Sequence, residues 1–413
     1  MTRYLVVVPD GAGDYEIESL GGKTPLETAD LKNINAYASV GEVGMVKTIP
    51  DGVAPGSDAA NLSVMGYDPS IYLTGRSPLE AASIGIDMSA TDVAFRTNII
   101  TLVRPDGSPA QAGDVYEDLI IKDHSSGDIT TEEADVLIQV VNEAFKNEKI
   151  SFYTGVSYRH CMIVHDGDTN YKMTPPHDVL DRRAGDYMPQ GEGVEFIADM
   201  MKKSFELLND HPVNVSRRER GLNPANTLWI WGQGRKPALD AFKEKFGITG
   251  TAISAVDLIK GIAICAGLNS VDVEGATGTI HTNFEGKAQA AIEEFKNGSQ
   301  FVYMHLEAPD ECSHQGDMAD KIKSLELIDE KIFAPVVNYL KESGDDFRVL
   351  VVPDHRTPIC IRTHSSEPVP YMIYDSRKET AKDETKAFCE EAGQKGRYFD
   401  SGYALADYFF EKQ

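Results

Sequence analysis

The sequence predicts an α/β protein with a largely parallel sheet flanked by helices, into which a second, smaller α/β domain is inserted. Short apolar runs alternate with helical patterns along most of the chain, which is typical of a parallel sheet covered by helices. One polar stretch of different character interrupts this alternation. The 413 residues are also too many for one small domain and indicate two or three.

Five apolar runs are predicted to form buried strands. β-Branched and aromatic residues follow one another in them almost without polar interruption, as in strands that are covered on both faces. The runs are Tyr4–Pro9, Thr227–Trp231, Phe301–Leu306, Val349–Pro353 and Val369–Tyr374. The helical patterns are Lys236–Phe246, Ala255–Ala266, Glu285–Lys296 and Met318–Ser343.

The polar stretch from about residue 98 to residue 224 is predicted to be the inserted domain. It has helical patterns at Thr131–Lys146 and Gly193–Asn209 and weaker strands near Phe152–Tyr153 and Met162–His165. The expected seams are Phe95–Thr97 and Asn223–Ala225. We therefore expect one domain made of residues 1–97 and 225–413, and a second made of residues 98–224.

The charge balance argues against several kinds of partner. The chain has 40 Lys and Arg against 65 Asp and Glu, a net charge of −25. Broad binding to nucleic acid or to anionic membranes needs a basic surface, so we expect neither. A phosphate-bearing substrate would need local positive charge from metal ions, arginines or helix N-termini.

The cysteines and the N-terminal segment bear on the cellular compartment. The five cysteines lie far apart and form no C-x-x-C pair, which argues against a disulfide framework and against a cysteine zinc site. No run of 18 apolar residues occurs, and the N-terminus has no charged-then-apolar signal region. We expect a cytoplasmic protein with reduced thiols.

Acidic and histidine side chains follow three of the predicted strands. Asp10 follows the first, Asp310 and His314 follow the run that ends at Leu306, and Asp354 and His355 follow the run that ends at Pro353. Ligands of open parallel sheets bind beyond the carboxyl ends of the strands, so we expect these groups to converge there. The spacing of Asp310 and His314 places both on one helical face.

The kind and number of these groups predict a pair of divalent cations. His364, which stands shortly before the next predicted strand, brings the set to three aspartates and three histidines. Carboxylates and neutral imidazoles suit Mn²⁺ or Zn²⁺ better than Ca²⁺. This donor set is about right for two ions on the order of 4 Å apart, an arrangement used in phosphoryl transfer.

Ser57 is the candidate nucleophile. It stands in the run PGSDAAN, where Gly56 leads into a helical pattern. The glycine allows a close approach of the backbone to a substrate, and a helix N-terminus presents unpaired N–H groups to an anion. Considered alone, Ser57 would be read as a helix N-cap. Beside two cations it becomes a candidate for covalent catalysis.

Several motifs, in this order along the chain, resemble the metalloenzyme core of the alkaline phosphatase superfamily. They are PDG at 9–11, PGSDAAN at 55–61, APDECSH at 308–314, PDH at 353–355 and THSSEPVP at 363–370. The resemblance is closer to the archaeal-type cofactor-independent phosphoglycerate mutases, and it extends to the runs TGRSPLEAAS, FRTN, SYRH and ISAVDLIKG.

The resemblance implies an alkaline-phosphatase-like core domain with two Mn²⁺ ions (Mg²⁺, Co²⁺ or Zn²⁺ in some members) and an inserted transferase domain. It implies one ion held by Asp10, Ser57, Asp354 and His355, and a second held by Asp310, His314 and His364. Ser57 would take the phosphate from 3-phosphoglycerate and return it to the 2-hydroxyl after the bound glycerate reorients.

The negative charge of such a substrate needs donors, which we expect mainly from the inserted domain. Arg159 and His160, in the run SYRH, are the first candidates, because arginine presents a planar fork suited to carboxylate or phosphate. Arg76, Arg96 and Lys287 are further candidates, and Lys287 could approach the transferred phosphate from the core domain.

Other functions are compatible with the same metal motifs. Some relatives in this subgroup have been proposed to be homoserine kinases, and a homoserine kinase-like phosphotransferase would have the same metal centre. A metal-dependent phosphatase or sulfatase is disfavoured because the inserted domain suggests exclusion of water. A catalytically inactive binding protein would be expected to lack a ligand, and none of the seven is missing.

Overall fold

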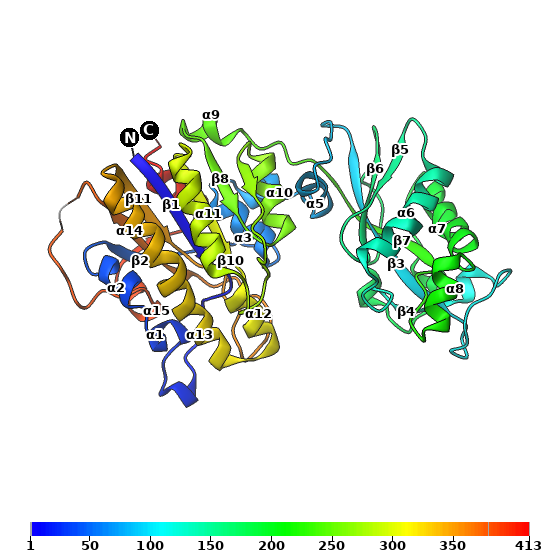
Figure 1. The fold of residues 1–413 in the computed structure, drawn as a ribbon, viewed down its shortest axis with the longest axis horizontal. Helices are drawn as coiled ribbons and strands as arrows, with labels where there is room; N and C mark the ends of the chain where they lie inside the picture. Colours follow the sequence, from blue (N-terminus) through cyan, green and yellow to red (C-terminus); the bar gives the residue numbers. More distant parts are fainter. Residues whose placement is uncertain (1, 379, 413) are drawn as a thin grey trace. The chain divides into compact units, whose positions relative to one another are not determined.

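The computed structural model describes residues 2–378 and 380–412. It divides the chain into two compact units. Unit 1 comprises the residues up to Leu73 together with those from Ala238 onward, and unit 2 comprises Thr74–Pro237. Figure 1 shows each unit as a sheet with helices packed on it.

The sheet of unit 1 is largely parallel, as the sequence predicts. Over residues 2–378 and 380–412 it has eight strands in the order β13-β2-β12-β11-β1-β10-β8-β9. The central strands β11, β1 and β10 are parallel to one another, whereas β12 is antiparallel to both of its neighbours. The bounds are β1 Thr2–Pro9, β2 Glu42–Val46, β8 Gly250–Ile253, β9 Asn269–Val271, β10 Phe301–Leu306, β11 Asp346–Val351, β12 Val369–Asp375 and β13 Arg397–Phe399.

Helices cover both faces of this sheet (Figure 1). On one face, Leu5 and Val7 of β1 and Val302 and Met304 of β10 join a buried apolar cluster with α2, α11, α13 and α14. The helix bounds are α1 Pro25–Thr28, α2 Lys32–Ala38, α3 Ser57–Val64, α4 Pro69–Tyr72, α9 Phe242–Phe246, α10 Asp257–Cys265, α11 Phe284–Lys296, α12 Ala308–Gln315, α13 Met318–Ile328, α14 Ala334–Ser343, α15 Glu390–Gly393 and α16 Gly402–Phe409.

Unit 2 has an antiparallel sheet with helices on it, and its residues are described without a gap. Strand β3 pairs with β4, β6 and β7, and β6 pairs with β5. The bounds are α5 Ser77–Ser83, β3 Val93–Val103, β4 Ile120–Asp123, α6 Thr131–Phe145, β5 Ile150–Tyr153, β6 Arg159–Val164, α7 Glu195–Leu208, α8 Pro212–Glu219 and β7 Thr227–Arg235. Its core gathers apolar side chains of α6 and α7 against the sheet.

The unit boundaries differ from the seams expected from the sequence. The expected seam at Phe95–Thr97 lies inside β3, an 11-residue strand that pairs with β6 and β7 and therefore belongs to one unit. The run Thr227–Trp231 was predicted as a strand of the parallel sheet, but it forms β7, which is antiparallel to β3 in unit 2. A buried apolar run has the same sequence pattern in a parallel and in an antiparallel sheet. The pattern therefore could not show to which sheet this strand belongs.

Two helix predictions also differ in detail. Of the pattern Lys236–Phe246 only Phe242–Phe246 is helical, because Lys236 directly follows β7 and precedes Pro237, and a residue before proline is disfavoured in a helix. The pattern Met318–Ser343 forms α13 and α14 with a π-helical turn at Asp329–Phe333 between them.

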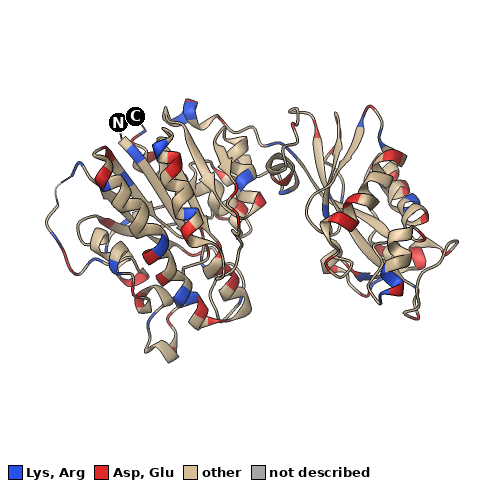
Figure 2. Ribbon diagram, viewed as in Figure 1, with Lys and Arg blue, Asp and Glu red and all other residues tan. Residues whose placement is uncertain are grey.

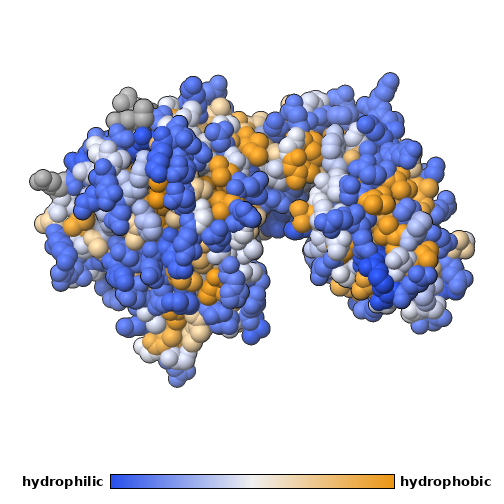
Figure 3. Space-filling view, viewed as in Figure 1, coloured by the Kyte–Doolittle hydropathy of each residue, from blue (hydrophilic) through white to orange (hydrophobic). Residues whose placement is uncertain are grey.

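The surface is consistent with the acidic composition. Acidic and basic residues are distributed over the elements of both units (Figure 2). In the view of Figure 3, hydrophilic residues dominate and hydrophobic ones show in smaller patches between them. None of the helices formed by the described residues is both long enough and apolar enough to cross a lipid bilayer.

Candidate metal centre

The acidic and histidine side chains predicted from the sequence meet at one edge of the unit 1 sheet. Strands β11, β1 and β10 are neighbours and run in the same direction. Asp10 directly follows β1, helix α12 with Asp310 follows β10, and Asp354 follows β11. The carboxyl ends of parallel strands share one edge, which is where open α/β sheets bind ligands.

Asp310, His314 and His364 form the first group that could hold a cation. Nε2 of His314 lies 3.1 Å from Oδ2 of Asp310 and 3.1 Å from Nε2 of His364. Asp310 and His314 stand one turn apart on α12, as their spacing predicts. Nδ1 of His314 lies 3.0 Å from the carbonyl oxygen of Arg362, which holds a proton on that nitrogen and makes Nε2, once deprotonated, the atom that would bind a cation.

Asp10, Asp354 and His355 lie together beside the first group. Nε2 of His355 lies 3.5 Å from Oδ1 of Asp10 and 3.4 Å from Oδ2 of Asp354. All three side chains are buried. Asp10 and His355 also form a possible cation group with Asp310. The six predicted Asp and His residues are therefore brought together by the fold.

Ser57 stands at the start of α3 and faces this cluster. Its Oγ lies 3.2 Å from Nε2 of His355. The preceding Gly56 offers no capping side chain, and within the first turn the N–H of Ala59 donates to Oδ1 of Asp58 over 2.9 Å. A helix N-terminus of this kind attracts an anion. The structure thus places the hydroxyl group of Ser57 and the N-terminus of α3 beside a set of side chains that could bind cations.

Gly11 permits the close approach of β1 and α12. Its φ of +61° is in the left-handed region, and a Cβ there would stand 2.5 Å from Oδ1 of Asp310. Its N–H donates to Oδ1 of Asp354 over 3.1 Å. The glycine of the PDG run is therefore required both by backbone conformation and by space.

The electrostatic surroundings of the clustered carboxylates favour the binding of a cation. Burial and the neighbouring carboxylates of Asp354 and Asp310 raise the pKa of Asp10 well above its usual value. Oδ1 of Asp10 is buried, and no group of the described residues donates a hydrogen bond to it. Side-chain hydrogen bonding to Asp310 raises the pKa of His314 to about 9. Divalent cations would supply the positive charge that these carboxylates lack.

Two residues of the site were not found in the sequence analysis. Asn61, four residues after Ser57 on α3, donates from Nδ2 to the carbonyl of Ser57 and to Oδ2 of Asp354, each over 2.8 Å. Its i, i+4 spacing from Ser57 was a usable signal. His305, inside β10, forms a possible cation group with Asp10 and Asp354. It stands inside the run Phe301–Leu306, whose pattern predicts a buried strand and gives no sign of a functional residue.

Lys287 lies near the site but does not face solvent. It is on α11 and fully buried, and its Nζ lies 2.8 Å from Oε2 of Glu307. From the sequence, this ammonium is expected to approach a transferred phosphate. In the structure a buried carboxylate already neutralises it.

Arg159 and His160 do not form the joint donor pair expected from the sequence. They are adjacent on β6 and so point to opposite faces of the sheet. Arg159 is exposed, whereas His160 is buried and its Nδ1 accepts from the N–H of Gly155 over 3.2 Å. Burial lowers the pKa of His160 to about 3, so the imidazole stays neutral at neutral pH. Because Nδ1 accepts, the proton is on Nε2, which is buried and has no partner among the described residues.

Arg159 instead ends a series of ring contacts in unit 2. The series runs through Tyr158, His124, His177 and Trp231 with centroid distances of 5.6, 6.0 and 5.4 Å. The guanidinium carbon of Arg159 lies 5.7 Å from the Tyr158 ring centroid, and that of Arg96 lies 4.7 Å from the Trp231 ring at the other end.

Arg96 and Arg76 differ in their surroundings. Arg96 donates from Nε and Nη2 to the carboxylate of Glu80 over 2.9 and 2.7 Å, so its charge is largely neutralised. Arg76 is exposed at the start of α5. Of the arginines predicted from the sequence, Arg159 and Arg76 are the exposed ones.

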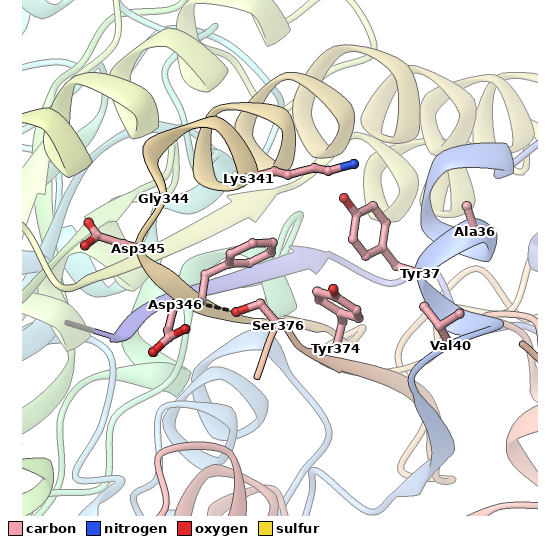
Figure 4. A pocket seen from close by; sticks show the side chains of 10 residues that line it. Ala36, Tyr37, Val40, Lys341, Gly344, Asp345, Asp346, Tyr374 and Ser376 are labelled. Carbon is pink, nitrogen blue, oxygen red and sulfur yellow. Dashed lines mark hydrogen bonds between the residues drawn. The ribbon is translucent and has the colours of Figure 1, made fainter. Parts of the chain in front are cut away.

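A separate cavity of about 580 Å³ lies in unit 1 and includes none of the predicted site residues. It is lined by Tyr37, Lys341, Phe347 and Tyr374, among others, and the N–H of Phe347 donates to Ser376 in it (Figure 4). Asp346, the first residue of β11, also lines it, whereas Asp354 follows the other end of that strand. This cavity is therefore distinct from the metal cluster.

Comparison with known proteins identifies the family. A sequence model of the family described as 2,3-bisphosphoglycerate-independent phosphoglycerate mutase matches residues 38–214. A mutase of that name from Methanosarcina barkeri is 45% identical over 95% of this chain and 95% of its own length. A probable mutase of the same name from Geobacter sulfurreducens is 40% identical over 99% of this chain and 100% of its own length.

Solved structures show the same fold. A protein from Pyrococcus horikoshii superposes with a TM-score of 0.81 at 28% identity, covering 99% of this chain and 97% of that one. The cofactor-independent phosphoglycerate mutase of Thermoplasma acidophilum superposes with a TM-score of 0.69 at 24% identity, covering 100% and 99%. The predicted fold class is confirmed. The chain belongs to the family of 2,3-bisphosphoglycerate-independent phosphoglycerate mutases and is an enzyme of the isomerase class.

Proposed function

We propose that this enzyme interconverts 3-phosphoglycerate and 2-phosphoglycerate through a phosphoserine at Ser57, as a step of glycolysis and gluconeogenesis. The observation that carries the proposal is the position of Ser57 Oγ, at the start of α3 and 3.2 Å from Nε2 of His355, beside clustered carboxylates and imidazoles. The names of the relatives that match almost the whole chain support the same activity.

We propose that the cluster holds two divalent cations, Mn²⁺ first and Mg²⁺, Co²⁺ or Zn²⁺ as substitutes. Asp10, Ser57, Asp354 and His355 would hold one, and Asp310, His314 and His364 the other. The mixture of carboxylate and imidazole donors and the unpartnered Oδ1 of Asp10 fit such ions. When bound, the ions supply Lewis-acid stabilisation of phosphoryl oxygens and favour ionisation of a nearby hydroxyl.

The chain's own groups then account for the transfer. Oγ of Ser57 forms a bond to the phosphorus of the 3-phosphate as the bond from phosphorus to the C3 oxygen breaks, and the serine proton passes overall to that oxygen. The reverse exchange at the C2 hydroxyl restores the serine. Asn61 holds the Ser57 carbonyl and Asp354 in place, and the positive end of the α3 dipole favours the phosphorylated serine.

Recognition of the substrate carboxylate is assigned by this proposal to the arginines of unit 2. Arg159 is the first candidate, because it is exposed and lies against the ring of Tyr158. Arg76 is the second. Arg96 ranks below them because Glu80 binds it through two hydrogen bonds. His160 ranks last, as a neutral donor whose Nε2 is buried. Lys287 is not proposed, because it is buried and paired with Glu307.

We also propose that the enzyme acts in the cytoplasm and binds neither nucleic acid nor membranes. All five cysteines are among the described residues and none of them forms a disulfide, as is usual in a reducing compartment. The net charge of −25 opposes binding to polyanions.

One coupled assay tests the proposed activity against its closest rival. Purified protein with Mn²⁺ receives 3-phosphoglycerate in one reaction and homoserine with ATP in another, and formation of 2-phosphoglycerate and of ADP is followed. We expect turnover only with 3-phosphoglycerate and without added 2,3-bisphosphoglycerate. ADP formation that depends on homoserine, with no mutase activity, would assign a homoserine kinase-like function. Release of inorganic phosphate alone would assign a phosphatase.

A further inference from the structure

His305 is a buried histidine beside the proposed cation ligands that the ligand set above leaves without a role. It lies in β10 and is 0% exposed. Its Nε2 lies 3.2 Å from Oδ2 of Asp10 and 3.9 Å from Oδ2 of Asp354. No group of the described residues makes a well-formed hydrogen bond to this nitrogen. A buried polar atom without a partner costs about 1–3 kcal/mol and calls for an explanation.

The other ring nitrogen of His305 is held by a carboxylate. Nδ1 lies 3.2 Å from Oε1 of Glu307 and 3.3 Å from Oγ of Ser254. With its proton on Nδ1, the ring donates to Glu307 and turns the lone pair of Nε2 toward Asp10 and Asp354. Histidines that bind metals have this arrangement, with a carboxylate on the nitrogen that does not bind the ion.

The charged groups around His305 have a net negative charge that a divalent cation would balance. Glu307 is paired with the buried Lys287 over 2.8 Å, so these two charges cancel. The inner carboxylates of Asp10 and Asp354 remain, both buried, with a combined charge of −2 when ionised. One divalent cation balances that charge, and uncompensated buried charge is otherwise costly.

The spacing of the donor atoms fits a shared ion. Two ligands bound to one five-coordinate ion at about 2.1 Å stand roughly 3.0 Å apart at an angle of about 90° and roughly 3.6 Å apart at about 120°. The separations of 3.2 and 3.9 Å from Nε2 of His305 are of this size. Asp10, His305 and Asp354 also form a group whose donor atoms all lie within 4.8 Å of one another.

We propose that Nε2 of His305 is a ligand of a divalent cation that it binds together with Asp10 and Asp354. Glu307 and Lys287 are then positioning residues that keep the imidazole in the binding tautomer. This inference rests on the metal centre of the proposed function and extends its ligand set by one residue.

Equilibrium dialysis against Mn²⁺ tests the proposal without any substrate. Metal-stripped wild type is compared with His305→Ala, His305→Gln and His281→Ala, the last being an exposed histidine of the same unit. We expect the two His305 variants to bind one equivalent of Mn²⁺ at least about 10-fold more weakly than wild type. His281→Ala should bind like wild type.

A second variant keeps His305 and removes the groups that orient it. The double substitution Lys287→Met with Glu307→Gln takes away both charges of the buried pair. Loss of such outer partners typically weakens metal affinity about 10- to 100-fold, and we expect a decrease in that range. Circular dichroism of each variant checks that it is folded, and this double variant provides the test if the His305 substitutions do not fold.

The outcomes separate this proposal from the proposed function. Unchanged or tighter Mn²⁺ binding by a folded His305 variant overturns the inference, because an imidazole that only neutralised the carboxylates would free them when removed. Wild type that binds no Mn²⁺ overturns the metal centre and this inference together. Wild type that binds Mn²⁺ normally but lacks mutase activity overturns the function alone.

A crystal of the wild type grown with Mn²⁺ gives an independent measurement. We expect an anomalous peak roughly 2.1–2.3 Å from Nε2 of His305, the range of bonds to such ions. A nearest peak more than about 3 Å from this nitrogen overturns the assignment.

Discussion

The hydroxyl oxygen of Ser57 lies 3.2 Å from Nε2 of His355, although the two stand 298 positions apart in the chain. Ser57 opens α3, and His355 follows β11 at the edge of the sheet where Asp10 and Asp310 also lie. The fold thus places an alcohol beside cation ligands, which is the basis of the first prediction.

Ser57→Ala should abolish interconversion of the two phosphoglycerates and the acid-stable phosphoenzyme. The substitution removes the oxygen that we propose bonds to phosphorus and leaves the carboxylates and imidazoles of the cluster. The coupled mutase assay and mass spectrometry of acid-quenched protein measure the two effects. Mutase activity that survives in Ser57→Ala refutes the covalent role.

Chelation should inactivate the enzyme while leaving it folded. The cluster is held by the chain's own bonds, such as those from Gly11 and Asn61 to Asp354, so the sheet does not depend on an ion. Some stability is lost because ligands stabilise only the folded state, about 2.7 kcal/mol at 100 times Kd. Activity, far-UV circular dichroism and recovery with Mn²⁺ are measured. Collapse of the dichroism signal on chelation would show a structural metal instead.

Lys287→Met should destabilise unit 1 by about 3–5 kcal/mol, because it leaves the buried carboxylate of Glu307 without its partner. Adding Glu307→Gln should restore most of that loss, which is the matched control. Urea unfolding followed by circular dichroism measures both. A phosphate-binding lysine exposed to solvent would behave differently. Its loss would change stability by no more than about 0.5 kcal/mol and would raise KM.

The stability of unit 2 should depend on His160 below neutral pH. In the unfolded chain a histidine binds a proton near pH 6.5, whereas burial lowers the pKa of folded His160 to about 3. Between these values the unfolded state binds more protons. The free energy of unfolding is therefore highest where His160 is neutral in both states. It decreases by about 1.4 kcal/mol per pH unit as the pH falls below about 6.5.

His160→Asn tests this dependence, because asparagine offers an acceptor for the N–H of Gly155 and does not titrate. The chain's two tryptophans are Trp229 and Trp231, both in unit 2, so their fluorescence reports unfolding of that unit. The difference in unfolding free energy between variant and wild type should shift by about 2 kcal/mol between pH 8 and pH 5. A difference independent of pH contradicts the prediction.

Arg159→Ala should raise KM for phosphoglycerate about 10- to 100-fold with little change in stability. A hydrogen bond to a charged group contributes about 1.5–3 kcal/mol, and Arg159 is exposed. Arg183→Ala is the control, since Arg183 is an exposed arginine of unit 2 paired with Asp118. Equal KM values for the two variants would remove Arg159 from the substrate site.

The sequence alone determined the cation ligands and the nucleophile as candidates. Asp10, Asp310 and Asp354 each follow a strand, and parallel strands end at one edge, so local pattern and sheet geometry were enough. The i, i+4 spacing of Asp310 and His314 was likewise readable, because a helix repeats on that period.

Tertiary structure alone decided what each remaining polar side chain contacts. His305 and Lys287 stand in runs that the pattern assigned only to a strand and a helix, and only packing shows that they lie on either side of Glu307. His160 and Arg159 are neighbours in sequence with opposite exposure. The physical reason is that side-chain partners from distant segments, and the face of a strand that is covered, depend on contacts between elements that local periodicity does not encode.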